Sequence, residues 1–332
     1  MISEAAPGDP APAFPDRIKK ADTMKHSSKA ILLPAPVQRR LEAIASAYFT
    51  SPPGQELNFS EPAGEPALNA PDSMSWQVFK NPLALFVGGV AAVILELGEP
   101  RVRTGVWTAT TFREDPMRRL RNTGLAAMMS VYGPRSRAEA MIAAINRRHA
   151  RISGRTPDGT PYRATEPELL DWVYATASFG FLEAYNAYVG PVGPAQRDRF
   201  YQEGRITSRL YGAVGAPTTQ REMDALLRRM GEKLERSDII FEFIDIMRRA
   251  PLLPGPLAYM QTMLVMAAIE LVPGWIRQRL GLGSEWDLRP WQRTLLRRTG
   301  AAAERLLLRS CPPVLACRRL GLPDDYLYRQ GH

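Results

Sequence analysis

Apolar residues recur at intervals of three, four and seven along most of the chain between Leu83 and Leu327. That spacing is typical of helices with one buried face. Near the middle of this region, two helices are predicted in succession. The first begins after Asp115, a residue type suited to an N-cap, with Pro116 at its first position. It is expected to end at Gly133-Pro134, because neither residue continues a helix well.

The second helix is predicted to begin at Ser136, which has the capping-box spacing to Glu139, and to end at Gly154, a suitable C′ residue. Its apolar residues follow one helical row: Ala138, Met141, Ile142, Ile145 and Ile152. Continuing this row by four residues from Ile145 reaches His149. The imidazole of His149 is therefore expected to point toward the protein interior.

Position alone leaves two interpretations of His149 open. It could be a core histidine with a hydrogen-bond partner, or a ligand for haem iron or another metal. A metal held by protein groups alone would need more ligands, yet His26 and His332 lie near the chain ends and the sequence has no cluster at zinc or di-iron spacing. A haem needs only one protein ligand, because the porphyrin supplies the other nitrogens. Haem is therefore the metal site that this chain could most easily build.

Arg119 and Thr123 lie four residues apart on the preceding helix and share one of its faces. Together they could hold a haem propionate or orient a ligand on the distal side of the iron. The same pair is typical of a solvated, arginine-rich helix edge, and the spacing alone favours that second interpretation.

Several longer segments carry a resemblance to a known family. In chain order they read GEPRVRTGV, FREDPMRRLRNT, RRHARISG, GTPYRATEPELLDWVYA, DRFYQEGR, APLLPGPL, ELVPGWIRQRLGL and CRRLGLPDDYLYR. The set resembles the catalytic domain shared by latex-clearing rubber oxygenases and MpaB-type oxygenases, and the last four segments resemble its bacterial members. The likeness covers roughly residues 80–329 and is far more specific than any single short motif.

The resemblance implies an all-α, globin-like fold, placed here as one large helical domain over residues 76–329. It implies haem b as the cofactor and an oxygenase that uses dioxygen to oxidise a hydrophobic substrate, isoprenoid-like or a polyene. The family's proximal iron ligand falls on His149. Its paired arginine and threonine fall on Arg119 and Thr123, which are thereby assigned to catalysis and cofactor binding.

The chain also departs from the family's pattern. Many bacterial relatives have histidine where this chain has Tyr174, and rubber oxygenases have lysine where it has Asn122. Tyr174 lies beside an apolar helix face, where it could hydrogen-bond near the cofactor or pack as a structural aromatic. The family's glutamate base lies upstream, where Glu96 and Glu99 are the nearest carboxylates. These departures motivate an alternative, a non-catalytic haem- or hydrophobic-ligand-binding protein of the same fold.

The net charge of the chain and its distribution limit the kinds of partner that we expect. The formal net charge is +9, which could indicate nucleic acid or an anionic membrane surface as a partner. The cations are spread among carboxylates without a nucleic-acid motif, so nucleic acid is not expected. The expected partners are a hydrophobic small molecule and dioxygen, with peripheral membrane contact as a further candidate. A membrane-surface structural protein is a third functional class, and the sequence leaves the oligomeric state unknown.

Residues 1–75 are predicted to form a flexible extension with one helix at about residues 36–50. Proline, alanine and charged residues predominate before this helix, and residues 51–71 after it have the composition of a linker. The N-terminal segment lacks the basic stretch and apolar core of a signal peptide, which favours a cytoplasmic location or one peripheral to a membrane. Residues 83–97 and 257–272 are apolar but shorter than the ~20 residues of a spanning helix. Buried core helices are predicted there.

Overall fold

The computed structural model describes residues 28–31, 33–49, 57–109, 115–250 and 258–329. Within these ranges the structure is helical apart from loops and one two-stranded ribbon, so the predicted all-α class is confirmed. The helices are α1 (Ala35–Phe49), α2 (Met74–Lys80), α3 (Pro82–Gly98), α4 (Pro100–Ala109), α5 (Pro116–Tyr132), α6 (Arg135–His149), α7 (Pro167–Tyr188), α8 (Pro194–Glu203), α9 (Arg205–Leu210), α10 (Gln220–Gly231), α11 (Asp238–Arg249), α12 (Ala258–Leu271), α13 (Gly274–Leu280), α14 (Pro290–Ala303) and α15 (Pro312–Arg319). The strands are β1 (Ser153–Arg155) and β2 (Pro161–Arg163), which pair antiparallel.

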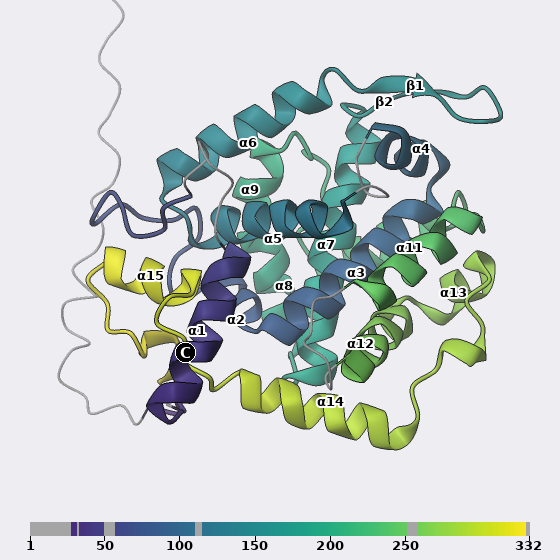
Figure 1. Ribbon diagram of the computed structural model, residues 1–332. Coiled ribbons are helices and arrows are strands. Elements are labelled where there is room, and N and C mark those ends of the chain that lie inside the picture. The colour runs from purple at the N-terminus through teal and green to yellow at the C-terminus, as the bar shows by residue number, and fades with distance from the viewer. Residues whose placement is uncertain (1–27, 32, 50–56, 110–114, 251–257, 330–332) are drawn as a thin grey trace, which may run out of the picture.

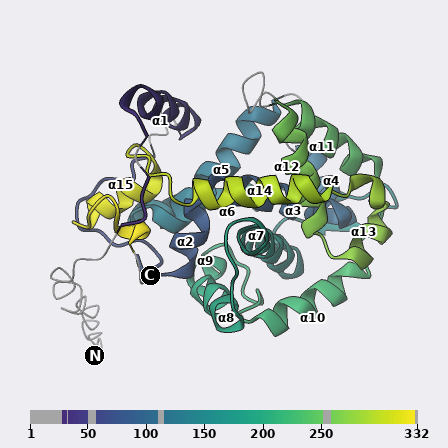
Figure 2. The same ribbon diagram turned by 90° about the horizontal axis from the view of Figure 1, so that it is seen from below.

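Helix α3 lies at the centre of the core, packed along α7 and also contacted by α11, α12 and α14 (Figures 1 and 2). Glu96 is the only charged residue in α3, and a helix that is apolar on all sides must be buried. Its start is defined locally, because Oδ1 of Asn81 accepts hydrogen bonds from the N–H groups of Leu83 and Ala84. The sequence therefore determines both the beginning of this helix and its central place.

Helices α3 and α7 touch backbone to backbone at two glycines. A Cβ added to Gly88 would lie 2.6 Å from the carbonyl oxygen of Gly180, and the reverse addition would clash with the carbonyl of Gly88. Neither position has room for a side chain. The close crossing fixes how the residues further along α3 and α7 lie relative to each other.

Helix α5 begins and ends where the sequence predicts. The Asp115 side chain accepts a hydrogen bond from the N–H of Arg118 at the start of α5, and Gly133 follows its last residue. Thr219 and Ser237 cap α10 and α11 in the same way. Short-range hydrogen bonds decide these positions, so a sequence pattern is enough to find them.

The predicted boundaries of α6 were wrong at both ends. The N–H and hydroxyl of Ser136 donate to the Glu65 carboxylate, at 2.6 and 3.0 Å, so the predicted capping box does not form. The helix ends at His149, while Gly154 lies in strand β1, which is joined to β2 by a turn with Gly159 at φ +89°. Strand pairing therefore takes residues that the pattern assigned to the helix.

Two helix boundaries differ from those that the sequence pattern indicates. The pattern indicates a new helix from Phe179 and a single helix over residues 194–211, but α7 runs unbroken through Phe179 and Gly204 separates α8 from α9. A glycine does not always mark a helix break, because Gly180 allows the close crossing with α3 and does not interrupt α7.

The described part of the predicted linker is packed on the domain. Phe59 and Leu68 are buried, and the guanidinium of Arg319 in α15 donates to the carbonyls of Phe59 and Glu65. Burial lowers the pKa of Arg319 to about 10. These hydrogen bonds to backbone carbonyls attach the segment that includes Phe59 and Glu65 to α15.

No single helix in the described ranges is both long and apolar enough to cross a membrane. Two helix pairs would reach that length together, α2 with α3 and α12 with α13, but they are bent by 96° and 109°.

Candidate functional site

Four helices bring four polar side chains together, and we call this set the interior cluster. It consists of Glu96 from α3, Arg119 from α5, His149 from α6 and Thr176 from α7. The charge of Arg119 acts on both Glu96 and His149, and the Thr176 hydroxyl lies 3.3 Å from Oε1 of Glu96. Figure 1 shows α5 lying between α6 and α3, which explains how one arginine reaches both neighbours.

His149 is the last residue of α6 and is partly buried. Its Nδ1 atom is buried and has no hydrogen-bond partner in the described protein. Burial lowers the pKa of the imidazole and the positive charge of Arg119 lowers it further, so the ring is neutral near pH 7. A buried polar atom without a partner costs about 1–3 kcal/mol, which a bound group could recover.

Glu96 is the carboxylate of the interior cluster. Burial raises its pKa from 4.5 to about 7, although the Thr176 hydroxyl and the charge of Arg119 both oppose the shift. Thr176 is itself fully buried, and its hydroxyl also lies 2.9 Å from the carbonyl oxygen of Val173. Glu96 therefore changes its protonation state near neutral pH.

Glu99, the other candidate carboxylate from the sequence, has a structural role. Its Oε2 accepts a hydrogen bond from the N–H of Val102 at 2.8 Å, and its Oε1 lies 2.7 Å from Nε of Arg101. Arg101 also reaches the carboxylates of Glu166 and Glu168. Glu99 thus begins α4 and joins an ion-pair network at the start of α7, away from the interior cluster.

Three other residues singled out from the sequence lie in different surroundings. The hydroxyl of Thr123 donates to the carbonyl of Arg119 within α5 at 3.0 Å, and the side chains of Thr123 and Asn122 are exposed. The hydroxyl of Tyr174 donates to the carbonyl of Gly204 at 2.7 Å, between α8 and α9. Among the described contacts, neither hydroxyl bonds to a side chain of the interior cluster.

One row of α3 remains partly accessible although the helix is central. It comprises Phe86, Gly89, Val93 and Glu96, which share a face at intervals of three and four. Because Glu96 interacts with Arg119, this accessible side of α3 is the side toward α5. The interior cluster therefore adjoins apolar surface that the surrounding helices do not seal.

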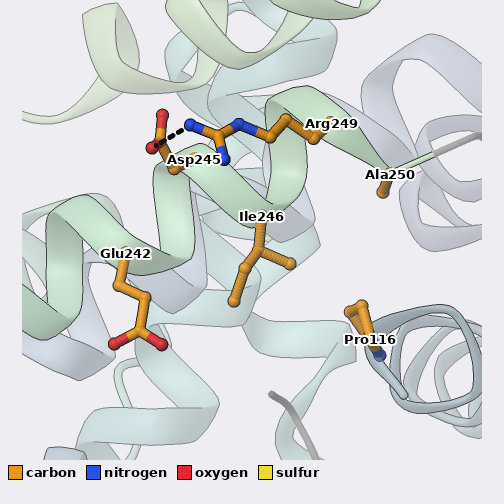
Figure 3. Close-up of a pocket in the computed structure, with 6 residues that line it drawn as sticks. All are labelled: Pro116, Glu242, Asp245, Ile246, Arg249 and Ala250. Atoms are coloured by element: carbon orange, nitrogen blue, oxygen red, sulfur yellow. Dashed lines mark hydrogen bonds and ion pairs between the residues drawn. The ribbon is translucent and has the colours of Figure 1, made fainter. Parts of the chain in front are cut away.

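A cavity of about 520 Å³ lies between the start of α5 and the last turns of α11 (Figure 3). Its lining residues are Pro116, Glu242, Asp245, Ile246, Arg249 and Ala250. Ile246 projects from α11 into this space, while Arg249 donates to Asp245 at 2.9 Å. The cavity is not lined by the interior cluster, but Pro116 lies one helical turn before Arg119, so both are at the same end of α5.

The side chains of the interior cluster can be compared with the donor sets that a haem and a metal ion require. Within the described ranges, no group of three or more His, Cys, Asp or Glu side chains could hold a metal ion. One neutral imidazole with an unpartnered nitrogen is what a haem iron requires of a protein, and an adjacent arginine suits the carboxylates of its propionates. The residues present fit this cofactor.

Residues 76–305 match the family described as ER-bound oxygenase mpaB/B'/Rubber oxygenase, catalytic domain. The match spans more than half of the 332 residues, and the chain belongs to this family of oxygenase catalytic domains. The matched residues include the whole interior cluster, and the resemblance drawn from the sequence motifs is confirmed. Comparisons with curated proteins and with solved structures give no match.

Sequence reasoning found His149 and Arg119 but did not select Glu96 over Glu99, and it missed Thr176. A usable signal for Glu96 was present, because it is the only charge in an otherwise apolar helix. Thr176 carries no such signal, since a threonine within an apolar helix face is common.

The raised pKa of Glu96 predicts a pH-dependent stability difference. Between pH 4.5 and about 7, the folded protein keeps the proton on Glu96, whereas the unfolded chain has lost it. The contribution of protonated Glu96 to the free energy of unfolding is therefore full below pH 4.5 and is lost as the pH rises through about 7. Denaturant unfolding of the wild type and of Glu96→Gln measures this contribution. Between about pH 5 and about pH 8, we expect the free energy of unfolding of the wild type to fall by about 1–2 kcal/mol relative to that of the variant, a modest value because water reaches part of the side chain.

Glu139→Gln, which removes an exposed carboxylate from α6, is the matched control. A difference between wild type and Glu96→Gln that stays constant with pH would contradict the raised pKa.

Proposed function

We propose that the protein is a haem b-dependent oxygenase that uses dioxygen to oxidise a hydrophobic small molecule, isoprenoid-like or a polyene. One observation carries the proposal: within an oxygenase catalytic domain, a neutral imidazole has a buried nitrogen without a partner. A core histidine of purely structural role would be expected to use that nitrogen in a hydrogen bond.

Haem, when bound, supplies the iron chemistry that activates dioxygen. His149 would hold the iron, because its lowered pKa keeps a ring lone pair free of a proton. Arg119 would place a positive charge beside the bound group and orient a propionate or another anionic oxygen. Arg119 comes from α5, whose start is capped by Asp115, and His149 is the last residue of α6, which ends shortly before the β1–β2 ribbon.

Glu96 would move the proton in the reaction. A carboxylate with a pKa of about 7 can accept a proton from a substrate carbon and return it at neutral pH. The Thr176 hydroxyl, 3.3 Å from Oε1, would orient the carboxylate, and Arg119 would stabilise its ionised form.

The proposed substrate class rests on the surface next to Glu96. Phe86, Gly89 and Val93 offer apolar, partly accessible surface along the same row of α3. A hydrophobic chain laid along this row would leave water and reach the carboxylate at its end. A charged substrate would gain little from these contacts.

A second function is favoured by two departures from the family's pattern. Asn122 stands where rubber oxygenases have lysine and is exposed, and the hydroxyl of Tyr174 is held by the Gly204 carbonyl. A protein that binds haem or a hydrophobic ligand without turning it over would tolerate both changes.

The experiment is to produce the full chain with a haem supply, record its absorption spectrum, and measure oxygen consumption with a panel of isoprenoids and polyenes. A Soret band together with substrate-dependent oxygen consumption is expected. A Soret band without oxygen consumption on any substrate would favour the binding protein. A spectrum without a Soret band after haem reconstitution would reject the haem-dependent oxygenase and leave only a protein that binds a hydrophobic ligand.

A further inference from the structure

Three of the seven most exposed large apolar side chains in the described structure lie together on one side of the molecule. They are Tyr259 at 59%, Trp291 at 49% and Leu295 at 38% exposure. Tyr259 stands at the start of α12, and its hydroxyl accepts a hydrogen bond from Nε2 of Gln292 in α14 at 3.3 Å. Tyr259 therefore lies beside the first turn of α14, the helix that carries Trp291 and Leu295.

Helix α14 presents these residues as one outward stripe. Trp291, Leu295, Arg298 and Ala302 follow each other by four, three and four residues and are all exposed. We call them, with Tyr259, the α14 face. The opposite side of the helix is buried at Gln292, Leu296 and Gly300. Figure 2 shows α14 crossing the near side of the molecule in front of α3 and α7, so no described helix covers its outer surface.

The exposed charged residues from Arg289 to Arg309 are all arginines. Four of them accompany the α14 face: Arg289, Arg297, Arg298 and Arg305. Within the described ranges none of them pairs with a carboxylate. The only carboxylate between residues 289 and 310, Glu304, turns inward to Nζ of Lys80 at 2.8 Å and to the Tyr185 hydroxyl.

We propose that the α14 face binds the surface of an anionic phospholipid membrane, with the helix lying in the plane of the interface. Trp, Tyr and Leu that project from a helix flanked by unpaired arginines match the boundary between acyl chains and anionic headgroups. The aromatic rings sit at headgroup depth, and the guanidinium groups meet lipid phosphates. This inference is independent of the haem and of the proposed reaction.

Two other occupants fit less well. A second copy of the chain, related by a two-fold axis, would bring the same arginines against each other. Nucleic acid would meet the arginines, but Leu295 and Ala302 at the centre of the stripe offer nothing to a phosphate backbone. Both remain outcomes of the experiment below.

The test is co-sedimentation of the full chain with vesicles of phosphatidylcholine alone and of phosphatidylcholine with phosphatidylglycerol. Wild type is expected to bind the anionic vesicles and to lose binding as salt is added. The double variant Trp291→Ser/Leu295→Ser should bind more than about tenfold more weakly. Arg289→Gln/Arg298→Gln should weaken binding by about tenfold, and only to anionic vesicles.

Two matched controls separate this face from exposure and charge in general. Ile206→Ser/Val214→Ser removes two exposed apolar side chains elsewhere, and Arg147→Gln/Arg148→Gln removes two exposed arginines from α6. Both controls should bind vesicles like wild type, and circular dichroism should show all variants folded.

Equal loss of vesicle binding in the control variants, or unchanged vesicle binding in the α14 variants, would overturn the proposal. So would a dimer in sedimentation velocity that Trp291→Ser/Leu295→Ser dissociates, or tight binding to duplex DNA without binding to vesicles.

Discussion

Replacement of His149 by alanine is expected to abolish the Soret absorbance of the protein. The imidazole is the only protein ligand that we propose for the iron, and His149 is the only histidine among the described residues. Loss of groups that merely orient a metal ligand costs 10–100-fold in affinity, so loss of the ligand itself should weaken haem binding by about 100-fold or more. Haem titration followed by absorbance measures the effect.

The control for this substitution is Arg147→Ala, which changes an exposed residue half a turn earlier on the same helix and should leave haem binding unchanged. A cavity variant, His149→Gly, adds a positive test, because free imidazole should restore the absorbance if the ring is the ligand. Haem loading that is the same in His149→Ala and wild type, with circular dichroism unchanged, would reject the assignment.

The second large effect is expected from Gly88→Ala, which should destabilise the fold by about 3 kcal/mol. The new methyl group would lie 2.6 Å from the carbonyl oxygen of Gly180 and 2.7 Å from the Cα of Phe181. Both are backbone atoms, so no rotamer change can relieve the overlap and the central pair of helices must separate. For a domain of this size, we expect the thermal midpoint to fall by about 6–12 °C.

Gly89→Ala is a matched control one residue away. A Cβ at Gly89 meets only Cε1 of Phe181, at 3.8 Å, which is an ordinary contact. This variant removes the helix penalty of glycine without a clash, so it should be neutral or more stable by up to about 1 kcal/mol. Similar unfolding midpoints for the two variants would show that the crossing is looser than the structure describes.

Local signals in the sequence explain why the start of α5 was predicted correctly, and the same signals cap α10 and α11. Asp115, Thr219 and Ser237 each cap a helix through a hydrogen bond that spans two or three residues, so the chain beside them is sufficient information. The end of α6 could not be found in this way. Gly154 suits a helix end and a strand equally, and its pairing with Tyr162 across the β1–β2 ribbon decides between them.

The same distinction applies to the candidate site. The helical row through Ile145 placed His149 toward the interior, while Arg119 was selected by the family resemblance, because its spacing from Thr123 alone favoured a solvated helix edge. The sequence could not show which of Glu96 and Glu99 is the carboxylate of the site, because they are three residues apart and equally near the expected position of the base. Packing separates them: Glu96 faces Arg119 and Thr176, while Glu99 is held by Arg101 at the start of α4.

By itself, the sequence determined the helical class, the family and the two residues that face each other from α5 and α6, because helix periodicity, caps and ordered motifs act over short stretches of chain. Only the tertiary structure decided which carboxylate joins them, where α6 ends and that α14 carries an outward aromatic and arginine face. These depend on contacts between residues far apart in sequence, such as Gly88 with Gly180 and Tyr259 with Gln292, and no local pattern encodes such contacts.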